Sequence, residues 1–311
     1  MYKDFFNFQF EPFSLTPDPS FMYLSPGHQE ALEHMLYGIR ERKGFVLVAG
    51  NIGAGKTTLT RLLLEQIPPQ THTALIFNTF LNEIELLRAI NREFGLAAES
   101  QSREALIREL NAFLIEQLNC GGNAVLIIDE AQNLTVPVLE QVRMLSNLET
   151  DNRKLIQIIL VGQPELARTL TRPELAQLSQ RVTVRCYLKP LDSHDTVRYI
   201  HHRLTKAGPQ STVRFDPSAL KLIHRLSGGV PRRINALCDR ALLAAYARGS
   251  RTIKKSHIRQ AHREINGEER FHSPSLADRL WPRAFIPAML ILLAVILAVY
   301  FGYRAAGVSG P

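Results

Sequence analysis

The segment from residue 50 to residue 57 constrains the fold of this chain more than any other part of the sequence. It reads GNIGAGKT and fits in full the pattern GxxxxGK followed by serine or threonine. The apolar run 45–49 before it is typical of a buried strand, and residues 58–66 after it have the pattern of a helix. A strand, a glycine-rich turn and a helix in this order build a phosphate-binding loop, so an α/β fold with a buried strand is required.

The chemistry expected of this loop follows from its residue types. Glycines let backbone N–H groups turn toward a phosphate, and the helix that follows adds the positive end of its dipole. We expect Lys56 to reach the β- and γ-phosphates, the Thr57 hydroxyl to bind Mg²⁺, and Thr58 to contact the α-phosphate. The predicted ligands are ATP and Mg²⁺, and the predicted nucleotide-binding residues of the loop are Gly50, Asn51, Ile52, Gly53, Ala54, Gly55, Lys56, Thr57 and Thr58.

A second motif, AVLIIDE at residues 124–130, is an apolar strand that ends in two acids. Such a pair is a weak sign alone, but here it follows the glycine-rich loop by about 70 residues, with another strand between them. We expect Asp129 to hold Mg²⁺ through water and Glu130 to be the general base that polarises the attacking water. A glutamate after the aspartate favours hydrolysis, the transfer of a phosphoryl group to water, over a nucleotide switch.

Strand and helix patterns alternate up to residue 190 and then give way to helices alone. Further strands are expected at 73–78, 155–161 and 181–186, and helices at roughly 28–42, 82–94, 103–118, 137–149 and 173–179. The alternation predicts a parallel five-stranded sheet between helices. After residue 192 helices are expected at about 192–206, 216–226, 231–248 and 255–265. A P-loop core followed by an all-helical lid is the layout of an AAA+ ATPase.

Composition and charge exclude several other classes of protein. With 45% hydrophobic residues among 311, the chain is not intrinsically disordered. The three cysteines, Cys120, Cys186 and Cys238, lie far apart, which excludes a disulfide framework and indicates a reducing compartment. The net charge of +8 belongs to the C-terminal third, because residues 1–190 carry −3 and residues 191–283 carry +10. That third suits either an anionic membrane surface or nucleic acid, and we favour the membrane.

Two terminal segments differ from the rest. Residues 1–27 are rich in aromatics and proline, and we expect an extended segment packed on the core, either covering the adenine side of the nucleotide pocket or serving only as packing. Residues 284–303 contain no charged side chain and at ~1.5 Å per residue would span ~30 Å. They predict one C-terminal transmembrane helix. Because ATP is cytoplasmic, we expect a single-pass protein of the cell inner membrane with its ATPase domain in the cytoplasm and residues 304–311 on the outer side.

Several longer stretches resemble the general secretion pathway protein A (ExeA-like) family, a branch of the AAA+ ATPases. Two of them are close to family signatures: PFSLTPDP at residues 12–19 and GQPEL at 162–166. The others are HQEAL at 28–32, the glycine-rich loop, DEAQ at 129–132, SNLET at 146–150, VG at 161–162 and GGVPRRIN at 228–235.

The resemblance implies roles for residues that the motifs alone leave unassigned. Gln163 takes the sensor position that reads the γ-phosphate and the water, the alternative being an ordinary turn residue before Pro164. Arg232, or its neighbour Arg233, takes the place of the lid arginine that closes onto the γ-phosphate. Arg181 is near the place of the arginine finger that acts in a neighbouring subunit; otherwise it is a plain helix-end arginine.

Together these expectations give a domain plan and a function. The plan is an N-terminal segment (1–27), a P-loop core (28–190), a helical lid (191–266), a basic linker (267–283), the membrane span and the short tail. The expected function is a membrane-anchored, homo-oligomeric ATPase that assembles or regulates an envelope complex (a secretion system, a pilus or a polysaccharide exporter) beside a membrane protein partner. The alternatives are a DNA-handling ATPase, although no nucleic-acid motif is present, and a nucleotide-switch scaffold with little turnover.

Overall fold

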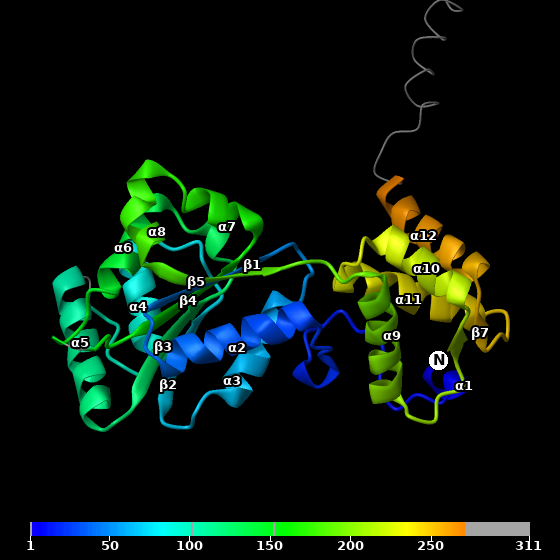
Figure 1. Cartoon of the computed structure of the whole chain (residues 1–311), viewed down its shortest axis with the longest axis horizontal. Coiled ribbons are helices and arrows are strands. Elements are labelled where there is room, and N and C mark those ends of the chain that lie inside the picture. Colours follow the sequence, from blue (N-terminus) through cyan, green and yellow to red (C-terminus); the bar gives the residue numbers. More distant parts are fainter. Residues whose placement is uncertain (1, 101, 152, 271–311) are drawn as a thin grey trace, which may run out of the picture. The chain divides into compact units, whose positions relative to one another are not determined.

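A parallel sheet of five strands forms the centre of the first part of the chain. The computed structural model describes residues 2–100, 102–151 and 153–270. The strand order is β2-β3-β4-β1-β5, and every neighbouring pair is parallel (Figure 1). The strands are β1 (Phe45–Gly50), β2 (Thr71–Ile76), β3 (Asn123–Ile128), β4 (Gln157–Gly162) and β5 (Val182–Leu188). The predicted five-stranded parallel sheet is confirmed.

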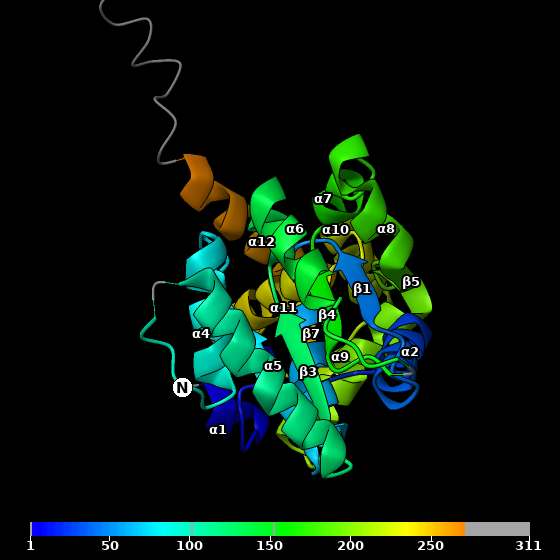
Figure 2. The same ribbon diagram turned by 90° about the vertical axis from the view of Figure 1, so that its left-hand side faces the viewer.

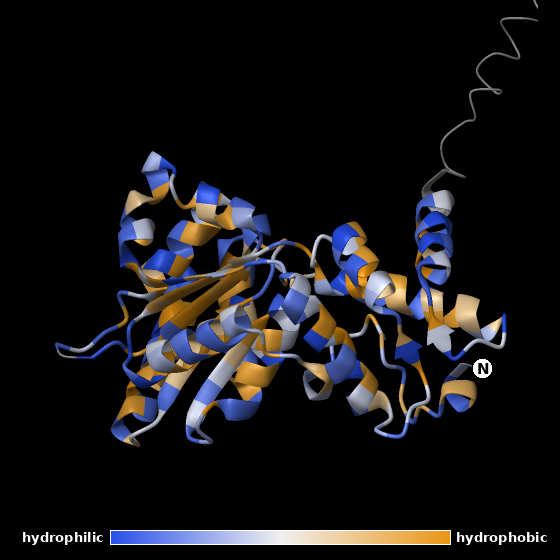
Figure 3. Ribbon diagram, turned by 45° about the vertical axis from the view of Figure 1, so that its right-hand side comes forward, coloured by the Kyte–Doolittle hydropathy of each residue, from blue (hydrophilic) through white to orange (hydrophobic). Residues whose placement is uncertain are grey.

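Helices cover both faces of this sheet, as Figure 2 shows with α4 and α5 on one side and α2 on the other. Leu47 and Leu126 face a cluster with side chains of α4, α5 and α6, whereas Val46 and Val125 face a second cluster with α2 and α3. Strands buried on both faces must be apolar at nearly every position, which explains their continuous hydrophobic runs (Figure 3). The helices are α2 (Pro26–Arg40), α3 (Lys56–Gln66), α4 (Glu83–Glu93), α5 (Arg103–Asn119), α6 (Val136–Leu145), α7 (Pro164–Thr169) and α8 (Ala176–Arg181).

The part after residue 191 is helical, with one small addition that the sequence pattern did not predict. Its helices are α9 (Ser193–Ala207), α10 (Pro217–Ser227), α11 (Pro231–Tyr246) and α12 (Lys255–Arg270). Two short strands, β6 (Arg214–Phe215) and β7 (Thr252–Ile253), pair in parallel between them. Local residues determine where these helices begin and end: the Asp192 side chain caps α9, Gly228 ends α10 in the left-handed region, and Pro231 begins α11.

The N-terminal aromatic segment contacts this lid extensively as well as the core. It begins with a short helix, α1 (Tyr2–Phe6), and the Tyr2 hydroxyl donates a hydrogen bond of 2.6 Å to Asp239. The backbone N–H groups of Gln9 and Phe10 both donate to the Ala207 carbonyl. Phe13 packs edge-on against Phe215. Phe6, Phe8 and Phe13 are buried, whereas Phe10 is exposed, so part of the aromatic segment adds to the hydrophobic interior of the lid.

The predicted fold class needs one correction, which concerns the transmembrane helix. No helix in the described part of the chain is long and apolar enough to cross a membrane. The longest of them, α5, has 17 residues and is amphipathic, because Leu106, Leu110 and Leu114 face the sheet while charged residues lie between them. Residues 284–303, where the sequence placed the span, lie outside the described residues. The described residues thus form an α/β core with a five-stranded parallel sheet and a helical lid, and they contain no transmembrane helix.

The chain divides into two compact units, Met1–Ile258 and Arg259–Pro311. The sheet, its covering helices, the N-terminal segment and the lid as far as the first turn of α12 all belong to the first unit.

We expect Leu47→Ala to destabilise the core strongly. Leu47 lies on an inner strand and is completely buried, so its truncation leaves a cavity that costs ~2–5 kcal/mol of unfolding free energy. Urea unfolding followed by circular dichroism measures this change. The matched control is Ile115→Ala on α5, where the side chain is 40% exposed and the loss should stay below ~1 kcal/mol. Equal losses at the two positions would contradict the packing described here.

Candidate nucleotide-binding site

The glycine-rich loop joins β1 to α3 at the carboxyl edge of the sheet, and two of its glycines have left-handed backbone angles. Gly53 has φ 76° and Gly55 has φ 96°, values that other residue types rarely adopt. At Gly53 a side chain would also collide with the lid, since a Cβ atom there would lie 2.5 Å from the Cβ of Arg232. The loop is therefore tied to the lid as well as to the core, and the Arg232 N–H donates to the Gly53 carbonyl.

Lys56, the first residue of α3, is a buried cation inside this loop. Only 5% of it is exposed, and its ammonium group donates hydrogen bonds to the carbonyls of Gly50 (2.9 Å) and Asn51 (3.3 Å). Among the described residues no carboxylate forms an ion pair with it. Burial lowers the pKa of Lys56, with the charges of Glu130 and Asp129 acting in the opposite direction. A buried ammonium group without an acidic partner fits an anionic ligand such as a phosphate.

Thr57 and Asp129 place two oxygen atoms side by side next to the loop. The Thr57 hydroxyl donates a hydrogen bond of 2.8 Å to the Asp129 carboxylate. Asp129 directly follows β3, is 1% exposed, and has a pKa raised by burial. Mg²⁺ prefers oxygen ligands and is commonly held by one or two protein groups together with substrate phosphates. The pair fits that ion, and the described residues contain no cluster of three or more histidines, cysteines or acids that could hold a metal by themselves.

Glu130 is held in an unusual conformation beside this pair. Its φ of 52° lies in the left-handed region, which costs on the order of 1–3 kcal/mol for a residue other than glycine and is often found at functional sites. The amide groups of Gln132 (2.6 Å) and Gln163 (3.3 Å) donate to the same carboxylate oxygen of Glu130. The Gln132 side chain in turn accepts from the Gln163 N–H at 2.9 Å. The two glutamines thus fix the glutamate side chain.

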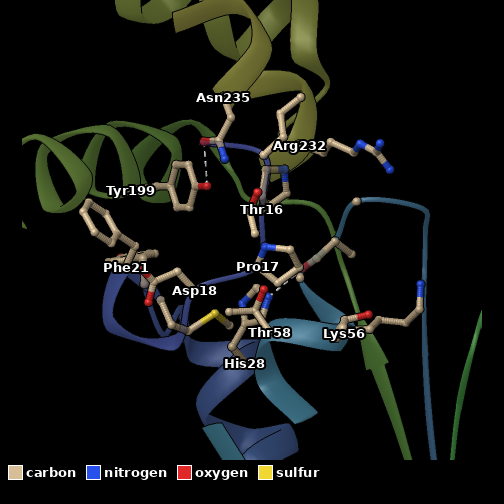
Figure 4. Close-up of a pocket in the computed structure, with 18 of the residues that line it drawn as sticks. Thr16, Pro17, Asp18, Phe21, His28, Lys56, Thr58, Tyr199, Arg232 and Asn235 are labelled. Atoms are coloured by element: carbon tan, nitrogen blue, oxygen red, sulfur yellow. Dashed lines mark hydrogen bonds between the residues drawn. The ribbon is translucent and has the colours of Figure 1, made fainter. Parts of the chain in front are cut away.

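A cavity of about 410 Å³ opens in front of the loop. Figure 4 shows residues of the core (His28, Lys56, Thr58), the lid (Tyr199, Arg232, Asn235) and the N-terminal segment around it. Glu130 and Gln163 also line this cavity. Its walls come from three distant parts of the sequence. Its volume is within the range of small-molecule sites, so a small ligand could bind there in contact with the loop.

The lid contributes Arg232 to this cavity wall, and Arg233 is not among the residues that line it. In the described part of the chain the Arg232 guanidinium has no hydrogen-bond or ion-pair partner, and it points away from Tyr199 (Figure 4). The geometry therefore favours Arg232 over Arg233 as the arginine that would meet a ligand.

Arg181 lies apart from the other predicted site residues. It is the last residue of α8, and its guanidinium donates a hydrogen bond of 2.5 Å to the hydroxyl of Ser146, at the end of α6. Arg181 is not among the residues that line the cavity. Arg181 is therefore not part of the candidate site of its own chain.

Two features of the site were not found by reading the sequence. Gln132 lies within a recognised stretch, but no pattern indicated that its side chain binds Glu130. The other is a polar cluster in the cavity wall, in which Tyr199 donates to Asn235 (2.8 Å) and Arg203 donates to the Pro12 carbonyl (2.5 Å). These residues are scattered along the chain, and only the position of Asn235, three residues after Arg232, could have drawn attention to it.

Fold and site together define a P-loop protein of the AAA+ class, and comparison with known proteins gives the family. Residues 39–170 match the family described as AAA domain. Over 268 residues, 86% of this chain, the sequence is 47% identical to General secretion pathway protein A of Aeromonas hydrophila. The chain belongs to the general secretion pathway protein A (ExeA-like) family of AAA+ ATPases. It spans 49% of the length of that relative.

Two solved structures share the fold. The ORC2 protein of Aeropyrum pernix, in its ADPNP–ADP complexes, has a TM-score of 0.60 at 19% identity, with 80% of this chain and 72% of that chain covered. CDC6P of Pyrobaculum aerophilum has a TM-score of 0.61 at 18% identity, with 80% and 71% covered. At these identities the likeness concerns the fold alone.

Buried histidines give a prediction for pH. Burial lowers the pKa of His28, His202 and His257 below the ordinary value of 6.5. Below about pH 6.5 the unfolded chain then binds more protons than the folded one, so the free energy of unfolding should fall as the pH is lowered through this range. Urea unfolding at pH 7.5, 6.5 and 5.5 measures the slope. A stability that rises between pH 6.5 and 5.5 would contradict it.

Proposed function

We propose that this chain binds and hydrolyses ATP with Mg²⁺, and that it uses the cycle to assemble or regulate a bacterial envelope complex of the secretion type. The observation that carries the hydrolytic part is that Lys56, Thr57 and Glu130 line one cavity, while Asp129 accepts a hydrogen bond from Thr57. The envelope part rests on the 47% identity to a protein named General secretion pathway protein A. We place the protein at the cytoplasmic face of the inner membrane, beside a membrane protein of the complex.

In this proposal each residue has a defined task. Backbone N–H groups of the loop and the Lys56 ammonium bind the β- and γ-phosphates, and Thr57 with Asp129 holds Mg²⁺, which neutralises charge on the phosphate oxygens. Glu130 accepts a proton from the attacking water, while Gln163 and Gln132 orient its carboxylate. Arg232 brings a positive charge from the lid to the γ-phosphate. We also propose that the ATPase core comprises residues 28–190 and the lid residues 191–266.

Glu130→Gln tests hydrolysis directly. The amide cannot accept the proton, so kcat should fall at least about 100-fold while the affinity for ATP stays within a factor of ~3. Phosphate release and the binding of a fluorescent ATP analogue measure the two quantities. Glu174→Gln, at an exposed position just before α8, is the matched control and should leave both unchanged. Full turnover by Glu130→Gln would overturn the assignment.

The same variant separates the proposed motor from a scaffold in cells. In a strain that lacks the chromosomal copy, wild-type protein should restore export of the substrates of the envelope system, and Glu130→Gln should not. Export restored by Glu130→Gln at normal protein level would favour the nucleotide switch. ATPase activity that rises with added DNA in a salt-sensitive way would favour the DNA-handling alternative.

Oligomerisation is the remaining part of the proposal, and Arg181 tests it. If Arg181 completes the site of a neighbouring subunit, Arg181→Ala should lose ATPase activity about 1,000-fold, because an arginine finger contributes ~10³–10⁵ in rate. When the Arg181→Ala protein is mixed with the wild type, ATPase activity should also fall more steeply than the fraction of wild-type subunits does. Arg185→Ala, nearby and exposed on β5, is the control. Activity proportional to the wild-type fraction would leave Arg181 as a helix-end residue that binds Ser146.

A further inference from the structure

His28 lies outside the glycine-rich motif, yet its ring contacts the loop directly. It is on α2, is 3% exposed and lines the cavity. Its Nε2 atom lies 2.9 Å from the Ala54 carbonyl oxygen, and its Nδ1 atom lies 2.6 Å from the Ser25 hydroxyl. A Cβ atom placed on Gly55 would lie 3.3 Å from the same Nε2. One buried histidine therefore fills the space behind the loop.

The hydrogen bonds define which nitrogen carries the proton. A carbonyl oxygen can only accept, so Nε2 of His28 must carry a hydrogen and donate it to Ala54. Burial lowers the pKa of His28, which keeps the ring neutral, and Nδ1 then accepts from the Ser25 hydroxyl. Ser25 is the N-cap residue of α2, but its side chain makes no capping hydrogen bond. Its hydroxyl orients the imidazole instead.

The position of the Ala54 carbonyl decides where the next N–H group points. The Ala54–Gly55 peptide is trans, like every peptide bond in the described chain, and in a planar trans peptide the C=O and N–H groups point in opposite directions. When His28 holds the Ala54 carbonyl on the α2 side, the Gly55 N–H must point to the other side. Because Gly55 has no side chain and adopts a left-handed φ, no side chain of its own restricts the orientation of this peptide.

We infer that His28 is a positioning residue for phosphate binding: through Ala54 it holds the Gly55 peptide in the orientation that a nucleotide phosphate requires. The inference rests on the proposed ATP binding and deepens it, because it assigns to α2 a role in forming the phosphate site. Ser25 acts one step further away, by fixing the ring of His28.

Two substitutions separate this role from a purely structural one. The side-chain amide of Gln at position 28 reaches the place of Nε2 and can donate to Ala54, whereas the shorter Asn reaches only the place of Nδ1 beside Ser25. The experiment uses the full chain and measures the dissociation constants of ATP and ADP, the KM of ATP hydrolysis, and the melting temperature. The control is His34→Ala on the same helix, where the ring contacts Cys186 at 3.4 Å.

We expect His28→Asn and His28→Ala to weaken ATP and ADP equally, by about tenfold, since loss of one hydrogen bond in the loop affects the β-phosphate common to both. His28→Gln and His34→Ala should remain within a factor of ~3 of the wild type. The inference is overturned if Asn preserves binding and Gln does not, or if Ala binds as tightly as the wild type. If Ala fails to fold, the comparison of Gln with Asn decides. Failure of the wild type itself to bind ATP would overturn the proposed function instead.

Discussion

The buried positive charge of Lys56 is the constraint on which the rest of the site depends. An ammonium group with 5% exposure and no ion-pair partner among the described residues is costly to bury; two backbone carbonyls accept its hydrogen bonds, and the nearby charges of Glu130 and Asp129 offset part of the cost. In the proposed function the phosphates of the nucleotide supply the remaining negative charge. The N–H groups of a helix start, the glycines with positive φ and the ammonium group all favour the same ligand. Asp129, which follows β3, stands at the edge of this positive region and accepts a hydrogen bond from Thr57.

The lid and the N-terminal segment complete the cavity that the loop begins. Arg203 of α9 connects them: its guanidinium binds the carbonyls of Pro12 and Ser14 and lies over the ring of Phe21. Asn235 of α11 binds Ser14 as well. Because Arg61 of α3 binds the Pro17 carbonyl, the same segment is also attached to the core. A segment fastened at both sides of a cavity restricts how a nucleotide could enter, and its prolines limit the backbone entropy lost in ordering it.

The strained backbone of Glu130 is connected to the neighbouring strand β2. The Thr79 hydroxyl, just after β2, donates to the Glu130 carbonyl at 3.2 Å, and the Asn133 amide donates to Thr79. The backbone of Glu130 is thereby held at its carbonyl, while Gln132 and Gln163 hold the carboxylate. A side chain fixed in this way loses little entropy when it acts, which is how preorganised sites keep a reactive group in place.

The sequence by itself determined the loop, the acid pair and the sheet. These depend on contiguous residues: the full GxxxxGK pattern followed by serine or threonine, between a strand and a helix, is specific to a phosphate-binding loop, and short apolar runs that alternate with helix patterns favour the strands of a covered parallel sheet. Tertiary structure alone decided which side chains reach the cavity in front of the loop. That Arg232 lines it and Arg233 does not, and that the ring of His28 lies beside the Ala54 carbonyl, have no local signature, because they depend on how α11 and α2 pack against the loop. The membrane span was predicted from the uncharged run 284–303, and no helix of the described residues is long and apolar enough to cross a membrane. Whether an apolar helix packs in a protein core or in lipid depends on its surroundings, which the local sequence does not contain.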